Sequence, residues 1–287
     1  MLLGAGSYLF RYAIGTDSFQ PEKPMDAVQL VEQAADLGFE LVQFADNLPL
    51  EGYSDAELDV VRETAIRRNI VLEAGTAGAR QDRLLRYLDI AVRLDAKLLR
   101  LTPHAPDTHV TKAETLEVLK HVLPQFRRAG VSIALENHFT MTSEDLSSLV
   151  SEAGDPLIGV CLDTANSIVQ QEWPRDTVRL LRQHAISLHL KDYKIKAHPA
   201  GIGVIIDGAP LGQGDQDIPA IFRFLENAGK QVNVILEQWM RPADTQEETL
   251  QNERMWIRQS VESARKHMAE SYAWTKGTGN AKAKESL

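Results

Sequence analysis

The sequence alternates between two kinds of segment, and this alternation constrains the fold more than any other feature. Short runs rich in Val, Ile and Leu are each followed by a longer amphipathic stretch with charged residues at helical spacing. Repeated βα units of this kind are typical of α/β folds with a parallel sheet. Eight units occur in 287 residues, and (β/α)₈ barrels commonly need about 250 residues. The pattern predicts a single-domain α/β fold of the (β/α)₈ TIM barrel class.

The eight predicted strands have lengths usual for barrel strands. They span residues 3–9, 39–44, 70–74, 97–102, 131–136, 157–163, 185–191 and 232–237. The predicted helices span residues 24–37, 54–68, 82–95, 111–129, 143–153, 174–184, 217–229 and 245–268.

Turn signals separate these segments in several places. Gly38, Gly130 and Gly229 each follow a predicted helix and precede a strand, and Thr142 begins a capping sequence. Residues 192–216 lack a clear helix or strand pattern, and we expect them to form a functional loop. The barrel is predicted to span 1–268. The polar segment 269–287 is predicted to be a disordered tail.

Charge and cysteine content narrow the class of protein. The formal net charge is −9 and the pI is about 5.4, which argues against a surface built to bind nucleic acid. The single cysteine, Cys161, excludes an intramolecular disulfide, so we expect a cytoplasmic protein. We find no targeting segment and no apolar run of the ~18 residues that a membrane span requires. A homo-oligomer is compatible with the sequence.

The last four predicted strands show a strict alternation of side chains. Successive side chains of a strand point to opposite faces. If Glu136, Asp163, His189 and Glu237 point into the barrel, their neighbours at odd spacing point outward to the helices. Those outward positions are all Val, Ile or Leu: Val131, Ile133, Leu135, Ile158, Val160, Leu162, Ile186, Leu188, Leu190, Val232, Val234 and Leu236.

The same alternation gathers ionisable side chains inside the barrel. Glu136, Asp163, His189 and Glu237 each lie near the carboxyl end of a strand, where barrel active sites are built, and Lys191 shares the inner face. Three carboxylates against one imidazole leave a net buried negative charge, which is costly without a cation. We therefore predict a divalent metal ion at this point. The alternative is an ion-pair network without a metal.

Four motifs on consecutive strands carry a family resemblance. They are Ile133-Ala134-Leu135-Glu136-Asn137-His138, Val160-Cys161-Leu162-Asp163-Thr164-Ala165-Asn166, Leu188-His189-Leu190-Lys191-Asp192 and Ile235-Leu236-Glu237. In order and spacing the chain resembles the xylose-isomerase-like TIM barrel superfamily, which includes sugar phosphate isomerases and epimerases, inosose dehydratase and the AP endonuclease 2-like repair enzymes.

The resemblance implies a metal centre and a reaction class. It implies that Glu136, Asp163, His189 and Glu237 hold one divalent ion, with Mn²⁺ favoured and Mg²⁺, Co²⁺ or Zn²⁺ as alternatives. Hard oxygen ligands with one imidazole suit such ions. The expected substrate is a small carbohydrate: a sugar, a sugar phosphate or a keto-sugar. The expected activity is isomerisation or epimerisation through an enediolate, with Glu136 and Glu237 moving the proton.

Lys191 supports a second reaction on the same scaffold. The sequence His-Leu-Lys-Asp resembles inosose dehydratase more than the tagatose-type epimerases. A positioned ammonium can bind a substrate carboxylate, protonate a leaving hydroxyl or stabilise an enolate. The alternative activity is therefore a metal-dependent lyase, either a dehydratase or a decarboxylase of a keto-sugar acid. A merely structural Lys191 would pair with Asp192 or with a metal-bound carboxylate.

Further polar residues near strand ends are candidates for substrate binding. Arg100 can clamp a carboxylate or phosphate through two hydrogen bonds, or form a structural salt bridge. The remaining candidates for substrate hydroxyls are His138, Asn166, His104 and Asp46. Pocket walls are predicted at Tyr8, Arg11, Asn47 and Trp239.

Three other functions are less well supported by the residues. A DNA-repair enzyme of this superfamily needs a His where this chain has Asn166, and further His ligands on the third and fourth strands. A metal-independent glycosidase using Glu136 and Glu237 leaves Asp163 and His189 unexplained. A sugar-binding module without catalysis does not need an acid/base pair beside the metal ligands.

Overall fold

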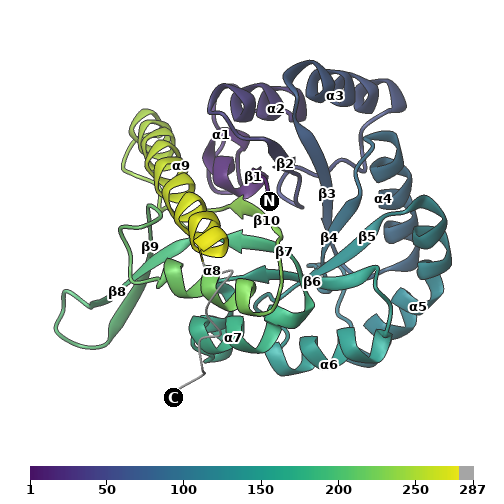
Figure 1. Ribbon diagram of the computed structural model, residues 1–287. Coiled ribbons are helices and arrows are strands. Elements are labelled where there is room, and N and C mark those ends of the chain that lie inside the picture. Colours follow the sequence, from purple (N-terminus) through teal and green to yellow (C-terminus); the bar gives the residue numbers. More distant parts are fainter. Residues whose placement is uncertain (278–287) are drawn as a thin grey trace.

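The chain forms a closed barrel of parallel strands surrounded by helices, as the alternation predicts (Figure 1). The computed structural model describes residues 1–277. Neighbouring barrel strands follow one another in chain order, and β1 closes the ring by pairing with β10. The barrel strands are β1 (Leu3–Gly6), β2 (Leu41–Gln43), β3 (Val71–Ala77), β4 (Leu98–Thr102), β5 (Ser132–Glu136), β6 (Ile158–Asp163), β7 (Ala185–Leu190) and β10 (Asn233–Leu236).

A helix follows each barrel strand before the next one begins. Capping positions agree with the sequence signals: Thr142 accepts a hydrogen bond from the backbone N–H of Asp145, and Gly130 ends its helix with a φ of 67°, a conformation that glycine adopts without strain. The helices are α1 (Arg11–Ile14), α2 (Ala27–Asp36), α3 (Asp55–Arg68), α4 (Gln81–Arg93), α5 (Lys112–Ala129), α6 (Ser143–Ala153), α7 (Pro174–Leu181), α8 (Ile218–Asn227) and α9 (Gln246–Gly277).

The predicted alternation is found in the hydrophobic core, with one correction. The outward residues of β5, β6 and β10, and Leu188 and Leu190 of β7, belong to the core between strands and helices. Ile186 instead packs inside the barrel against Leu98, Ala134 and Cys161. The register of β6 and β7 shifts between Val160 and Cys161, and this β-bulge turns the side chain of Ile186 to the other face.

Two segments differ from the sequence prediction in their secondary structure. The first strand ends at Gly6, and residues Ser7–Phe10 form a 3₁₀ helix. Residues 192–216 are not an irregular loop, because β8 (Asp192–Ala197) and β9 (Val204–Ala209) pair as an antiparallel hairpin. The hairpin projects from the barrel beside α9 in Figure 1. Its strands carry Lys, Asp and Gly among the apolar residues, so their pattern does not identify strands reliably.

The last helix continues beyond the predicted end of the barrel domain. Helix α9 runs to Gly277, whereas the sequence pattern placed the end of the helix at residue 268. The remainder of the predicted disordered tail, 278–287, lies outside the described residues. None of the helices in the described part of the chain combines the length and apolar character that a bilayer crossing requires.

Candidate metal centre

Neighbouring strands bring the four predicted metal ligands to one end of the barrel. Glu136 is the last residue of β5, Asp163 is the last residue of β6, and Glu237 directly follows β10. His189 lies in β7 and pairs in register with Asp163. All four side chains are buried, with residue exposures between 0% and 7%. Because parallel strands end at the same rim, residues far apart in the sequence meet there.

The Nδ1 atom of His189 lies at the centre of this cluster. It is 3.3 Å from Glu237 Oε1, 3.6 Å from Glu136 Oε2 and 3.9 Å from Asp163 Oδ2. Within residues 1–277, neither His189 Nδ1 nor Glu237 Oε1 has a hydrogen-bond partner. The same holds for Asp163 Oδ2, whose contact with Lys191 is ionic. Buried polar atoms are rarely left without partners, so the convergence of three such atoms indicates a binding site.

The chemistry of this cluster fits a divalent cation. One ligand atom from each of Asp163, His189 and Glu237 can be chosen so that all three lie within 4.8 Å of one another. Carboxylate oxygens and one imidazole nitrogen are a ligand set that Mn²⁺ or Mg²⁺ accepts. A cation at this point would supply a partner for His189 Nδ1 and Glu237 Oε1, and it would share Asp163 Oδ2 with Lys191. Glu136, whose Oε2 lies 3.6 Å from His189 Nδ1, is close enough to be the fourth ligand.

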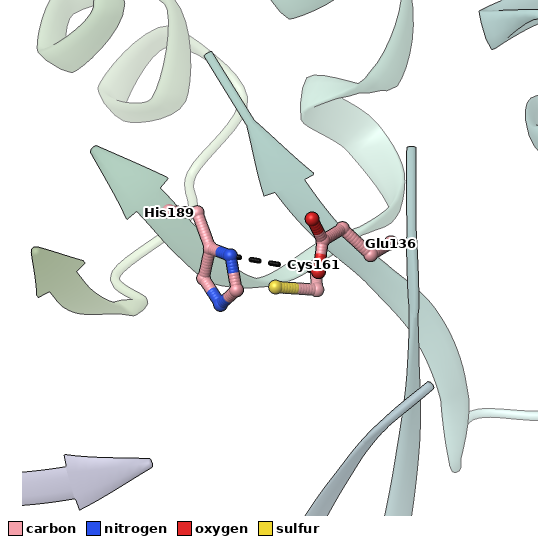
Figure 2. Close-up of side chains that lie close together, drawn as sticks. All are labelled: Glu136, Cys161 and His189. Atoms are coloured by element: carbon pink, nitrogen blue, oxygen red, sulfur yellow. Dashed lines mark ion pairs between the residues drawn. The ribbon is translucent and has the colours of Figure 1, made fainter. Parts of the chain in front are cut away.

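Cys161 lies beside the cluster but is a poor candidate ligand. Figure 2 shows its sulfur next to His189 and Glu136, and these three residues also meet the distance criterion for a metal site. Burial raises the pKa of the Cys161 thiol well above its usual range. Because the thiolate is the form that binds metals, a thiol that stays protonated leaves the carboxylates as the better ligands.

Two buried cations hold the glutamates of the cluster. Arg100, from β4, donates from Nε to Glu136 Oε2 and from Nη1 to Asp46 Oδ1 at 2.7 Å. Lys191 Nζ lies 2.7 Å from both Asp163 Oδ2 and Glu237 Oε2. It also lies 5.3 Å from the centre of the Trp239 ring.

These contacts decide between alternatives that the sequence left open for the two cations. Lys191 pairs not with Asp192 but with Asp163 and Glu237, which are two of the predicted metal-ligand carboxylates. Asp192 instead accepts hydrogen bonds from four backbone N–H groups, those of Tyr193, Gly212, Gly214 and Gln216. Arg100 forms the buried salt bridges that were one of its two predicted roles.

The charges around the cluster shift the acidity of its members in opposite directions. Burial by itself raises the pKa of Glu237, but His189 and Lys191 outweigh burial and lower the pKa to about 2. Burial raises the pKa of Asp163; Lys191 opposes the shift, and Glu136 and Glu237 add to it. The raised pKa of Asp163 indicates that the protein's own cations do not fully stabilise three ionised carboxylates here.

The residues predicted to bind substrate are only partly brought together. Asn166 is buried and donates to Glu136 Oε1 at 2.8 Å, and Asp46, more exposed, pairs with Arg100. His138 is half-buried beside Phe139, and burial lowers its pKa. His104 contacts Thr140 Oγ1 in the loop after β5, at 2.8 Å from its Nδ1.

The residues predicted as pocket walls also differ in their surroundings. Tyr8 donates to Asp46 Oδ2 at 3.0 Å, and Asn47 contacts the hydroxyl of Ser7 at 2.5 Å. Arg11 is exposed. The roles assigned to all these residues stay predictions.

Sequence reasoning missed a second group of buried polar residues deeper in the barrel. Gln43 on β2 and Glu73 on β3 are buried, and Asn233 begins β10. Gln43 Oε1 lies 2.5 Å from His189 Nε2, so this group contacts the candidate metal centre directly. The only available signal was a Glu within an otherwise apolar strand at residues 70–74.

Comparisons with known proteins agree with this fold. The family model described as xylose isomerase-like TIM barrel matches residues 31–265. The 3-oxo-isoapionate decarboxylase of Pectobacterium atrosepticum is 30% identical over 261 residues, which cover 91% of this chain and 94% of that protein.

Two solved structures share the fold at low sequence identity. D-psicose 3-epimerase with D-tagatose, from Clostridium cellulolyticum H10, matches with a TM-score of 0.70 and 17% identity, covering 94% of this chain and 99% of that chain. A xylose isomerase-like TIM barrel protein from Mycobacterium smegmatis in complex with magnesium has a TM-score of 0.67 and 15% identity, covering 91% and 97%.

Proposed function

The chain belongs to the xylose isomerase-like TIM barrel family, and we propose that it is a divalent-metal-dependent decarboxylase of a 3-oxo sugar acid. Membership of this family supports an enzyme that acts on sugars. The choice of reaction rests on one observation: the ammonium of Lys191 is buried between Asp163 and Glu237, at the edge of the candidate metal centre.

In this proposal, Glu136, Asp163, His189 and Glu237 hold the ion. The ion supplies a Lewis acid that withdraws electrons from the ketone oxygen of the substrate. Mn²⁺ is the ion to load first, with Mg²⁺, Co²⁺ and Zn²⁺ as comparisons. The unpaired atoms of His189 and Glu237 support this ligand set.

The reaction breaks the bond between the carboxylate carbon and the neighbouring carbon of a 3-oxo acid. The electron pair of that bond moves toward the ketone to form an enolate, and CO₂ leaves. The carbon that loses CO₂ then takes up a proton. The ammonium of Lys191 stabilises the negative charge of the enolate, and the proton comes from solvent.

The surrounding charges favour an acidic substrate. Once a divalent ion binds, the positive charges of the ion, Arg100 and Lys191 exceed the negative charges of the three carboxylates that face it. Asp46 offsets this excess from a position where its side chain is 37% exposed. A substrate carboxylate can replace Asp46 on the guanidinium, because Arg100 presents its donors in a fork that matches a carboxylate.

Isomerisation or epimerisation is the second candidate. Glu136 and Glu237 reach the cluster from strands separated by β6 and β7, so they can flank a reacting carbon. Proton abstraction, however, needs a free base near neutral pKa. Arg100 and Lys191 hold these two carboxylates as ion pairs, which favours their ionised form and weakens them as bases. Decarboxylation does not need a base, and this difference supports the lyase.

The test is a paired assay of metal-free and Mn²⁺-loaded protein. One panel contains 3-oxo sugar acids and is assayed for CO₂ release. The other contains ketoses and is assayed by chromatography for epimers and isomers. We expect CO₂ release that requires the ion and is lost in Lys191→Met, with Lys191→Arg as the charge-conserving control. Epimer formation without CO₂ release would instead support the second candidate and reject the decarboxylase.

A further inference from the structure

A chain of polar side chains runs through the barrel interior beneath the candidate metal centre. Gln43 Nε2 donates to Glu73 Oε2 at 2.8 Å, and Asn233 Nδ2 donates to Glu73 Oε1 at 3.1 Å. His189 Nε2 lies 2.5 Å from Gln43 Oε1. The proposed reaction uses none of the three residues below His189. Three strands supply Gln43, Glu73 and Asn233, so their alignment depends on the tertiary structure.

The direction of each hydrogen bond in this chain follows from its far end. The backbone N–H of Leu2 donates to Asn233 Oδ1 at 3.1 Å, so the amide of Asn233 must turn its NH₂ group toward Glu73. Both oxygens of Glu73 accept a hydrogen bond, one from Asn233 and one from Gln43. Gln43 therefore presents its NH₂ group to Glu73 and its carbonyl oxygen to His189.

The same logic determines which ring nitrogen of His189 carries the proton. A carbonyl oxygen accepts but does not donate, so Nε2 is the protonated nitrogen when it faces Gln43 Oε1. Nδ1 then has a free lone pair, and it is the atom that faces Glu136, Asp163 and Glu237.

We propose that Gln43 and Glu73 are positioning residues that set the tautomer of His189 and so prepare its Nδ1 to bind the divalent ion. The inference deepens the proposed function, because it rests on the metal centre assigned there. Ligating histidines generally depend on the hydrogen bond of their other ring nitrogen for orientation and tautomer. Here the partner is an amide, and a buried carboxylate determines which way that amide points.

The variant Glu73→Gln reverses the hydrogen bonds from residue 73 to Gln43 and from Gln43 to His189, while the side chain at position 73 keeps its size. Oε1 of the new glutamine continues to accept from Asn233, which the Leu2 backbone holds in place. Its NH₂ group then faces Gln43 where a carboxylate oxygen was. Gln43 must rotate to offer its oxygen to residue 73 and its NH₂ group to His189. Nε2 becomes an acceptor, and the proton moves to Nδ1, the nitrogen needed for the metal.

The double variant Gln43→Glu with Glu73→Gln restores the direction of the hydrogen bond between His189 and residue 43. The new glutamine donates to one oxygen of the new glutamate, and the other oxygen accepts from His189 Nε2. The net charge equals that of the wild type, since the two residues have only exchanged their groups. If the two residues had a purely structural role, two substitutions would weaken Mn²⁺ binding more than one. If they control the tautomer of His189, the second substitution restores Mn²⁺ binding.

The first measurement reads the tautomer in metal-free protein. Nuclear magnetic resonance of ¹⁵N-histidine-labelled protein distinguishes protonated from unprotonated ring nitrogens, and His189→Gln identifies the signal. The pH is raised until the ring is neutral. We expect the proton on Nε2 in the wild type and the double variant, and on Nδ1 in Glu73→Gln. A wild-type proton on Nδ1 overturns the proposal without any need for a variant to fold.

The second measurement is Mn²⁺ affinity by isothermal titration calorimetry. We expect Glu73→Gln to bind Mn²⁺ about 10–100-fold more weakly and the double variant to return toward the wild-type affinity. Glu253→Gln is the matched control, because Glu253 is another buried glutamate, on α9, that accepts hydrogen bonds from two backbone N–H groups. It is expected to leave affinity unchanged.

The outcomes separate this proposal from the proposed function. Equal affinity of Glu73→Gln and wild type, or a double variant no better than the single one, overturns the role of Gln43 and Glu73. Stoichiometric Mn²⁺ binding with the expected tautomers but no CO₂ release rejects the decarboxylase alone. A wild type that takes up no ion rejects the metal centre and both proposals with it.

Discussion

Replacing Lys191 with Met tests the charge balance of the candidate metal centre. Lys191 is 3% exposed, and its ammonium lies 2.7 Å from carboxylate oxygens of both Asp163 and Glu237. Burial alone lowers the pKa of Lys191, but the charges of these carboxylates outweigh it and raise the pKa above its ordinary value. Met has a similar length and no charge, so the substitution removes the cation and little volume.

The expected loss of stability is large without the metal. Removing one partner of a buried ion pair typically costs about 3–5 kcal/mol, because the other charge stays buried. For a chain of this size, 1 kcal/mol corresponds to about 2 °C in Tm. Metal-free Lys191→Met is therefore expected to unfold about 6–10 °C below the wild type.

The divalent ion should compensate for most of that loss. It faces the same carboxylates, and it no longer meets repulsion from a neighbouring ammonium. Binding at 100 times Kd stabilises a protein by about 2.7 kcal/mol. Because the variant should bind the ion more tightly than the wild type, the same concentration of Mn²⁺ should raise its Tm further.

The assay is thermal unfolding followed by circular dichroism, with chelator and with Mn²⁺, for wild type, Lys191→Met and Lys191→Arg. The Arg variant retains the charge and should stay close to the wild type in chelator. Equal Tm values for metal-free wild type and Lys191→Met would refute the assignment of Lys191 as counter-charge. An equal Mn²⁺-induced rise in both proteins would refute the competition between lysine and metal.

Three further predictions concern other parts of the molecule. Gly75→Ala places a Cβ 2.1 Å from the backbone oxygen of Phe44, so β3 must shift; we expect a loss of about 1–3 kcal/mol in chemical denaturation. Asp192→Asn puts an NH₂ group against backbone N–H donors; a loss of about 1–3 kcal/mol and faster proteolysis within 192–216 are expected. Unchanged proteolysis would contradict the idea that the hydrogen bonds to Asp192 hold this segment in place. Burial raises the pKa of Glu253 to about 7, despite hydrogen bonds from two backbone N–H groups that oppose the shift. Because the pKa of Glu253 is raised in the folded state, the stabilising contribution of Glu253 is full below about pH 4.5 and is lost as the pH rises through 7. The free energy of unfolding of the wild type relative to Glu253→Gln should fall by about 3 kcal/mol across this window, whereas a flat difference would contradict the shift.

The family resemblance was a sound guide to the fold, and it was less specific about the reaction. The alternation of apolar and amphipathic segments predicted each barrel strand, and the four motifs agree with the family that matches residues 31–265. The motifs are shared by isomerases, epimerases and lyases, so they led to an isomerase or epimerase as the first expectation. The ion pairs of Arg100 and Lys191 now favour the lyase as a proposal.

The sequence by itself determined the barrel strands, the facing of their side chains and the residues that converge at one rim. These properties repeat along the chain with a period of two, so neighbouring residues reveal them, and the exception at Ile186 arose where a bulge interrupts the period. The tertiary structure alone decided the partners: Arg100 with Glu136, Lys191 with Asp163 rather than Asp192, and Gln43 beneath His189. Such pairings depend on the register and curvature of strands that are distant in the sequence. Local patterns do not encode which side chains then come within hydrogen-bonding distance.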